Sequence, residues 1–255
     1  MRINTNVGAL TASRNSFVNN MATENSMRKL SSGLRISRAA DDAAGLAIAN
    51  KLRTQSRSLN QAAANSEQGN AMLQIAEGAA QTIQRIIERQ KELITQKLNG
   101  TSSSATSTTI NAEITTLQSE AARVKADANF QGTSVFGTLT FQVSDNSTNG
   151  SFSVTSEFTL STLGGSSSLT DADSALDAIN GSLAAIGAGQ NRLDYTVQNL
   201  KSAVVNVRAA ESTIRDVDMA EEMASFTRNN ILSQAAQAML SQANQGSQGV
   251  LQLLR

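Results

Sequence analysis

The N-terminal end of the chain carries a narrow stripe of apolar side chains. Its members lie at steps of four and three residues with Arg14 in the one gap: Ile3, Val7, Leu10, Phe17 and Met21. A stripe this narrow is typical of a helix that packs along another helix, because a core-facing helix carries a broader apolar face. We therefore predict a first helix over about residues 2–32. Gly33 should end it, since glycine readily adopts the left-handed backbone of a helix C-terminus.

A second helical pattern runs from about residue 43 to Leu98. Asp41 and Asp42 are candidate N-caps for it, and a short irregular joint separates it from the first helix. At ~1.5 Å per residue such a rod would be roughly 80 Å long. A loop over residues 99–104 should end it, and a third helix should then fold back antiparallel on the rod. Two sets of apolar residues carry these predictions: Leu52, Leu59, Leu73, Ala80, Ile87 and Ile94, with Ser66 on the same phase, and then Ile110, Ile114, Leu117, Ala121, Val124 and Ala128.

Residues 129–163 change to an alternating pattern, which is typical of strands. Leu139, Phe141 and Val143 would share one face of a strand. Asn149-Gly150 is a favoured hairpin turn. The alternation resumes after it at Phe152, Val154, Phe158 and Leu160. These residues predict a small β-hairpin region.

The most regular segment of the chain follows. Thr170 and Asp173 resemble a capping box that would open a long helix. Its heptad positions are apolar except for Gln190 and Glu211, which predicts a helix packed along another helix. A final helix should run from about Met219 to the C-terminus. The heptad positions are Leu176, Ile179, Leu183, Ile186, Gln190, Leu193, Val197, Leu200, Val204, Val207, Glu211 and Ile214.

Together these patterns predict a mainly α fold. We expect a long antiparallel helical coiled-coil bundle with a small β-hairpin region, in which the N- and C-terminal helices pair. The predicted organisation is a terminal helix and joint over 1–42, a helical rod over 43–169 with the hairpin at about 129–163, a second rod helix over 170–215, and a C-terminal helix over 216–255.

Composition argues against catalysis and cofactors. The chain has no His, Cys or Trp, so the commonest general base, the thiol nucleophile and most transition-metal ligands are missing. The charges balance at 21 basic and 21 acidic residues, which removes the electrostatic attraction that nucleic-acid binding needs. No apolar run is long enough to span a membrane, and the start of the chain lacks the apolar core of a signal peptide. We expect no enzyme activity, cofactor, nucleic acid or membrane partner. Proline is also absent, which suits long helices.

The two terminal helices pose a physical problem. A pair of narrow helices rich in Asn, Gln, Ser and Ala buries too little surface to offset the backbone entropy of ~1 to 2 kcal/mol per ordered residue. We therefore predict that both ends are disordered in the free monomer and fold among neighbouring copies. A repeated contact that does not close gives an open filament. The predicted assembly residues are Ile3, Val7, Leu10, Phe17, Met21, Ile231, Leu232, Met239, Val250, Leu251, Leu253 and Leu254.

Four stretches of the sequence resemble the bacterial flagellins. They are Met1–Asn6, Leu30–Ile36, Ala39–Ala49 and the end from Gln242 to Arg255. The resemblance implies a short flagellin without variable outer domains, whose terminal helices form the core of an extracellular flagellar filament used for motility. It also implies unfolded export through the flagellar type III apparatus. The expected partners are other subunits, an export chaperone, the filament cap and the hook-filament junction proteins.

The same resemblance extends to a surface of the rod. Arg89, Leu93 and Glu113 match positions that the flagellin-sensing Toll-like receptor of animals recognises, although the pattern departs at Ile94-Thr95. The alternative is that they are ordinary charged and packing residues of a helix. The Ser- and Thr-rich loops over 101–109 and 144–170 likewise resemble O-glycosylated loops, or are plain solvated loops.

Three other interpretations stay open at this stage. The hook-filament junction proteins have similar terminal helices but match Ala39–Ala49 and the C-terminal Leu-Leu-Arg less well. A helical adaptor or chaperone-like module would use its apolar stripes for a single partner and would not polymerise. An enzyme would need a deep pocket lined with carboxylates.

Overall fold

The computed structural model describes residues 6–99, 103–145, 150–159 and 168–253. The fold is mainly helical, as predicted. The chain divides into two compact units, Met1–Thr54 with Val207–Arg255, and Gln55–Asn206. Both boundaries fall inside long helices, so α2 and α4 each contribute to the two units. The helices are α1 (Val7–Ser32), α2 (Ala43–Lys97), α3 (Ser104–Asp127), α4 (Leu169–Arg215) and α5 (Met219–Leu253).

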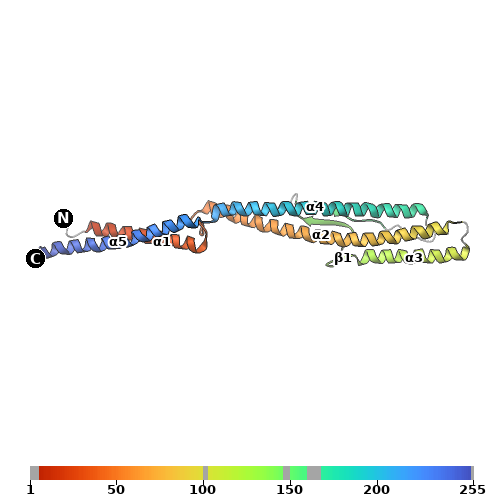
Figure 1. Ribbon diagram of the computed structural model, residues 1–255, viewed down its shortest axis with the longest axis horizontal. Coiled ribbons are helices and arrows are strands. Elements are labelled where there is room, and N and C mark those ends of the chain that lie inside the picture. The colour runs from red at the N-terminus through yellow and green to blue at the C-terminus, as the bar shows by residue number, and fades with distance from the viewer. Residues whose placement is uncertain (1–5, 100–102, 146–149, 160–167, 254–255) are drawn as a thin grey trace. The chain divides into compact units, whose positions relative to one another are not determined.

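The unit formed by Gln55–Asn206, which we call the rod, has its own apolar core. Within it, α3 returns antiparallel along α2, and α4 runs beside them (Figure 1), which confirms the predicted helical bundle. The heptad residues predicted from the sequence supply nearly half of the core residues. The largest fully buried side chains there include Leu73, Ile83, Ile87, Ile94, Ile114, Ile179, Ile186 and Leu193.

Polar groups fix how the helices of this core are aligned. The fully buried Gln90 donates from Nε2 to the carbonyl oxygen of Ile114 at 3.1 Å. Gln190 of α4 donates from Nε2 to Glu77 of α2 at 2.9 Å. Because an unpaired buried amide is costly, these bonds favour one alignment of neighbouring helices.

The strand region holds two antiparallel pairs rather than one hairpin. β1 (Asn129–Phe130) pairs with β2 (Thr133–Ser134) across a two-residue turn, and both turn residues, Gln131 and Gly132, have positive φ. Glutamine is not a typical residue for such a turn, which is why the sequence did not predict it.

The second pair is the hairpin that the sequence predicts. β3 (Thr138–Gln142) pairs with β4 (Ser151–Thr155), with Leu139 opposite Val154 and Phe141 opposite Phe152. Asn149 and Leu160 lie outside the described residues, so the predicted Asn-Gly turn stays a prediction.

The helix ends follow the expected caps with one exception. Gly33 is left-handed at φ 70° and ends α1, and Asp42 accepts a hydrogen bond from the backbone N–H of Gly45 at the start of α2. At α4 the capping box is made by Ser168 and Asp171, each accepting from the other's backbone N–H. The box predicted at Thr170 and Asp173 was therefore wrong by two residues. Asp173 instead pairs with Lys91 of α2.

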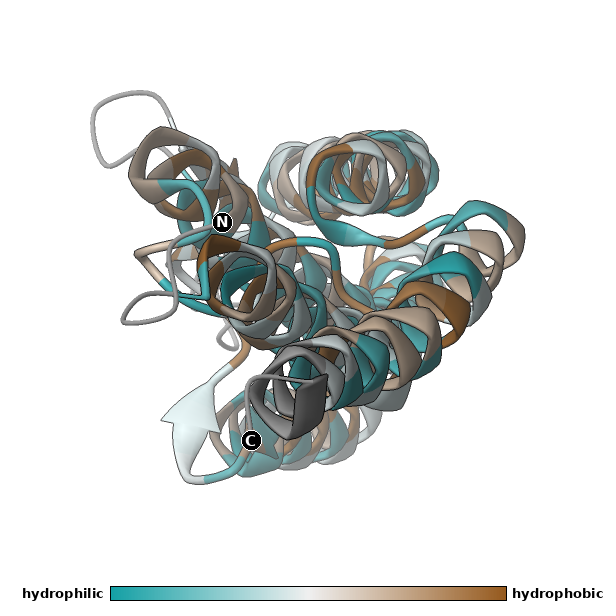
Figure 2. Cartoon of the chain, turned by 90° about the vertical axis from the view of Figure 1, so that its left-hand side faces the viewer, coloured by the Kyte–Doolittle hydropathy of each residue, from teal (hydrophilic) through white to brown (hydrophobic). Residues whose placement is uncertain are grey.

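Each long helix alternates between hydrophilic and hydrophobic residues along its length (Figure 2). In the part of the chain that the structure describes, none of the helices combines the length and hydropathy that a membrane span needs.

Candidate functional site

The terminal helices α1 and α5 pack side by side and run in opposite directions (Figure 1). Three polar contacts along their length show this. Asn6 donates from Nδ2 to the carbonyl oxygen of Ala243 at 3.0 Å, and Ser233 donates to Asn20 at 2.6 Å. At the other end, Lys29 lies 3.7 Å from Glu222. The predicted pairing of the two ends of the chain is therefore confirmed.

The inner face of this pair is made mostly of small and polar side chains. On both helices the buried and half-buried residues recur at alternating steps of three and four, which is the spacing of a helix-helix seam. Leu30, Phe226 and Leu240 are the large apolar residues in it. The seam consists of Ala9, Ala12, Ser16, Asn19, Thr23, Ser26 and Leu30 on α1, and Glu222, Phe226, Asn229, Ser233, Ala236, Leu240 and Ala243 on α5.

Apart from Leu30, Phe226 and Leu240, the predicted large apolar side chains that the structure describes point away from this seam. The predicted stripe was expected to be the surface by which the terminal helices pack, and within one chain that expectation is wrong. The small residues allow the two backbones to approach closely, so they occupy the contact and leave the larger side chains outside. The outward residues are 45% to 65% exposed: Val7, Leu10, Phe17 and Met21 on α1, and Ile231, Leu232 and Met239 on α5. We call this set the outer apolar face.

Other predicted assembly residues cannot be placed on this face. Ile3 and Leu254 lie outside the described residues. Val250, Leu251 and Leu253 belong to the backbone of α5, but their side chains are outside the described part.

An open, mostly apolar depression lies on α5. It is lined by Met223, Ala224, Thr227, Arg228, Ile231 and Leu232. All six come from the same helix, so no other described part of this chain fills the depression. A monomeric soluble protein rarely exposes an extended apolar surface without a partner that covers it.

The joint between α1 and α2 is tied to the segment that precedes α5. Leu34 forms an isolated β-bridge with Asp216, and the N–H of Arg35 donates to the carbonyl oxygen of Arg215 at 2.7 Å. The N–H of Val217 donates back to Gly33 at 3.1 Å. Sequence reasoning missed this link, because two single residues far apart in the chain carry no pairing pattern.

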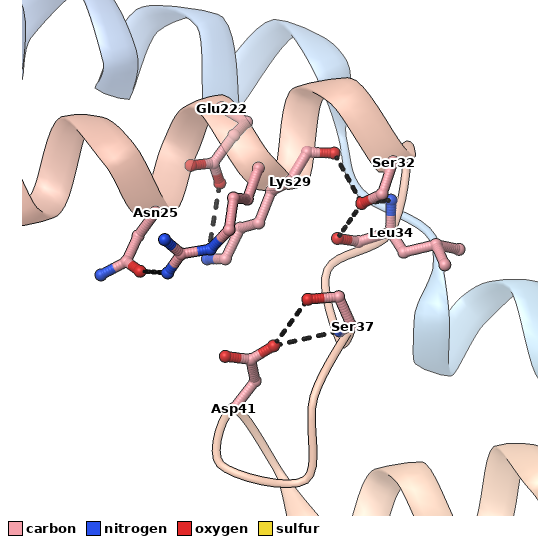
Figure 3. A network of polar contacts seen from close by, with 8 residues as sticks. Asn25, Lys29, Ser32, Leu34, Ser37, Asp41 and Glu222 are labelled. Carbon is pink, nitrogen blue, oxygen red and sulfur yellow. Dashed lines mark hydrogen bonds and ion pairs between the residues drawn. The ribbon is translucent and has the colours of Figure 1, made fainter.

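The carboxylate of Asp41 organises the turn within this joint (Figure 3). It accepts hydrogen bonds from the N–H of Ser37 at 3.0 Å, from the Ser37 hydroxyl at 3.2 Å and from the N–H of Arg38 at 2.9 Å. Bonds from the backbone of Arg38 and then Ser37 lower the pKa of Asp41 below its ordinary value of 3.8, since they stabilise the charged form. Nearby, Ile36 is buried and packs close to Gly45.

The structure brings together two of the three residues matched to receptor recognition. Arg89 of α2 lies 3.0 Å from Glu92 and 3.4 Å from Glu113 of α3. The hydrogen bonds that Arg89 donates to Glu92 and then to Glu113 raise the pKa of Arg89 above its ordinary value. Leu93, in contrast, is buried in the core of the rod. The surface therefore presents the Arg89–Glu113 pair without the leucine side chain.

Within the described ranges, no group of three or more His, Cys, Asp or Glu residues is arranged to hold a metal ion.

Comparison with known proteins finds two matching family models. The bacterial flagellin N-terminal helical region matches residues 3–139, and the bacterial flagellin C-terminal helical region matches residues 169–254. Three similar proteins align over their whole length and the whole of this chain. They are a flagellin of Halalkalibacterium halodurans at 44% identity, a flagellin of Bacillus subtilis at 40%, and a flagellar filament 33 kDa core protein of Treponema phagedenis at 38%. A crystal structure of Bacillus cereus flagellin, 24% identical, covers 58% of this chain and 94% of its own with a TM-score of 0.49.

Proposed function

Since this chain belongs to the bacterial flagellin family, we propose that it polymerises through the outer apolar face of α1 and α5. As a flagellin it is a structural subunit of the bacterial flagellar filament, which lies outside the cell. Only residues 140–168 separate the two matched regions, so it is a short form without outer domains.

One observation carries the proposal. The terminal helices contact each other mainly through small and polar residues, and they leave the seven large side chains of the outer apolar face uncovered. Burying those residues against other copies would recover about 1.5 to 3 kcal/mol for each fully covered side chain. Summed over one subunit, that gain could offset the entropy of fixing the subunit in a polymer. An adaptor would instead cover this face with a single partner and would not polymerise.

A matched pair of substitutions tests the proposal. Leu10 and Leu98 are 62% and 63% exposed, but Leu98 lies just after α2, in the unit Gln55–Asn206, and is not a member of the outer apolar face. Leu10→Asp should raise the critical concentration for polymerisation by about tenfold or more, because assembly would bury an unpaired charge. Leu98→Asp should leave it within about twofold, as expected of a surface change. Sedimentation of polymer over a concentration series measures both. Equal effects of the two substitutions would refute the proposal.

We also propose export through the flagellar type III apparatus, followed by encounters with an export chaperone, the filament cap and the hook-filament junction proteins. The absence of cysteine supports this route, since no disulfide could prevent the chain from being threaded unfolded. In a host strain that lacks the export gate, the protein should stay inside the cell. Its appearance in the medium of that strain would contradict the proposal.

Detection by the flagellin-sensing receptor is a separate proposal, supported by the exposed Arg89–Glu113 pair. Arg89→Ala should lower the response of receptor reporter cells to purified monomer. A response that the substitution leaves unchanged would show that Arg89 is an ordinary helix surface residue.

A further inference from the structure

Five methionines stand out on the terminal helices. Met21 and Met27 on α1 are 50% and 55% exposed, and Met219, Met223 and Met239 on α5 are 49%, 48% and 63% exposed. Methionine is an apolar residue that cores usually cover. Met72, in the core of the rod, is 7% exposed and follows that rule. Among the described residues, the exposed methionines thus all belong to the unit that carries the outer apolar face.

We propose that these methionines are a peroxide-sensitive modification site that blocks polymerisation when oxidised. The inference rests on the proposed function, because it requires assembly to cover the outer apolar face. Beyond that function, the inference describes an oxidised form of the monomer that cannot assemble.

The positions of the methionines support this role. Met223 lines the apolar depression on α5 together with Ile231 and Leu232. Met239 follows Leu232 by seven residues, close to two helical turns, so it continues the same side of the helix. Met21 belongs to the outward stripe of α1 with Leu10 and Phe17. The side chains of these three methionines therefore lie on the exposed apolar surface that polymerisation would bury.

The rest of the chain offers few competing targets. It has no cysteine, histidine or tryptophan and one tyrosine. Thiolates would otherwise react with peroxide first. In this chain the exposed thioethers are the groups left to react.

The chemistry is balanced with hydrogen peroxide as the oxidant. A lone pair of the thioether sulfur attacks one peroxide oxygen, and the O–O bond breaks as the S–O bond forms. The sulfur is oxidised by two electrons to the sulfoxide, and the departing hydroxide takes up the remaining proton to give water. A flexible apolar side chain becomes a polar one that carries a strong acceptor. Because burying an acceptor without a partner is unfavourable, an oxidised face should assemble poorly.

The test compares oxidised and untreated full-length protein. Monomer is treated with hydrogen peroxide, the oxidant is removed, and peptide mass spectrometry measures each methionine. Met223 and Met239 should oxidise at least about tenfold faster than Met72, since exposure controls the rate. The critical concentration of the oxidised protein should rise by about tenfold or more. Preformed polymer treated in the same way should oxidise more slowly at these positions than monomer.

Two controls keep the outcome decisive. A variant that carries Met21→Leu, Met27→Leu, Met219→Leu, Met223→Leu and Met239→Leu retains Met72 and should polymerise equally well before and after peroxide. If that variant does not assemble, oxidised wild-type protein is treated with methionine sulfoxide reductases, which should restore polymerisation. Unchanged assembly of the oxidised protein, or no recovery after reduction, would overturn the inference. Failure of untreated protein to polymerise would instead count against the proposed function.

Discussion

Gly189 shows how the absence of one side chain lets the β-hairpin approach α4. A Cβ at this position would lie 2.8 Å from Cγ2 of Val154 and 3.2 Å from Cδ1 of Leu73. At Gly187, two residues earlier on the same helix, a Cβ would meet no atom of the described residues within 4 Å. The packing of the hairpin therefore requires glycine at position 189, whereas position 187 has room for a larger side chain.

This difference gives a prediction with its own control. Gly187→Ala should raise the free energy of unfolding by about 0.5 to 1 kcal/mol, because alanine favours the helix. Gly189→Ala should lower it by about 1 to 3 kcal/mol, since Val154 and Leu73 must shift. Urea unfolding followed by circular dichroism measures both values. Stabilisation by both substitutions would mean that the hairpin does not pack tightly on α4.

The carboxylate of Asp41 makes the joint sensitive to acid. Its pKa is lowered in the folded chain, so its contribution to stability is present above the pKa of the unfolded chain and is lost as the pH falls through the folded pKa. We expect the amide NMR signals of Ser37 and Arg38 to follow one titration with a midpoint below 3.8. Asp41→Asn should abolish that titration. A midpoint above 3.8 would show that the backbone bonds do not favour the charged carboxylate.

At the scale of elements, the sequence predicted the rod far better than the terminal helices. The heptads of α2, α3 and α4 carry large apolar residues, and the structure buries most of them. In α1 and α5 the sequence carries two periodic patterns, one apolar and one small and polar. Hydropathy identifies the first, but close backbone approach selects the second for the seam. Choosing between them requires knowing what covers the apolar side, which one chain cannot reveal.

The composition of the seam leads to a prediction for the two helices. With few large residues in it, the pair is weakly stabilised compared with the core of the rod. In dilute monomer, amides of residues 7–32 and 225–253 should exchange hydrogen with little protection, whereas the amides around Ile83 and Ile87 should be protected. In the polymer, both sets of amides should be protected from hydrogen exchange. Strong protection of α1 and α5 in the monomer would remove the energetic reason for assembly.

At the scale of the molecule, we expect different parts of the chain to provide the stability of the rod and the contacts for polymerisation. The unit over Gln55–Asn206 has its own core and a set of interhelical bonds. Removing residues 1–32 and 225–255 should therefore leave its cooperative thermal unfolding in place, because each unit keeps its own contacts. The same truncation should abolish polymerisation. Polymer growth by the truncated protein would mean that the rod alone carries the subunit contacts.

The smooth seam between α1 and α5 has a mechanical consequence as well. Between the large residues Leu30, Phe226 and Leu240, the alanines and serines of the seam present no protruding side chains that interlock. Resistance to sliding along the helix axes therefore depends on those three side chains and on the polar contacts at Asn6, Asn20 and Lys29. Under a shearing load these few points would yield first. A subunit joined in this way can let its terminal helices shift lengthwise while each helix stays intact.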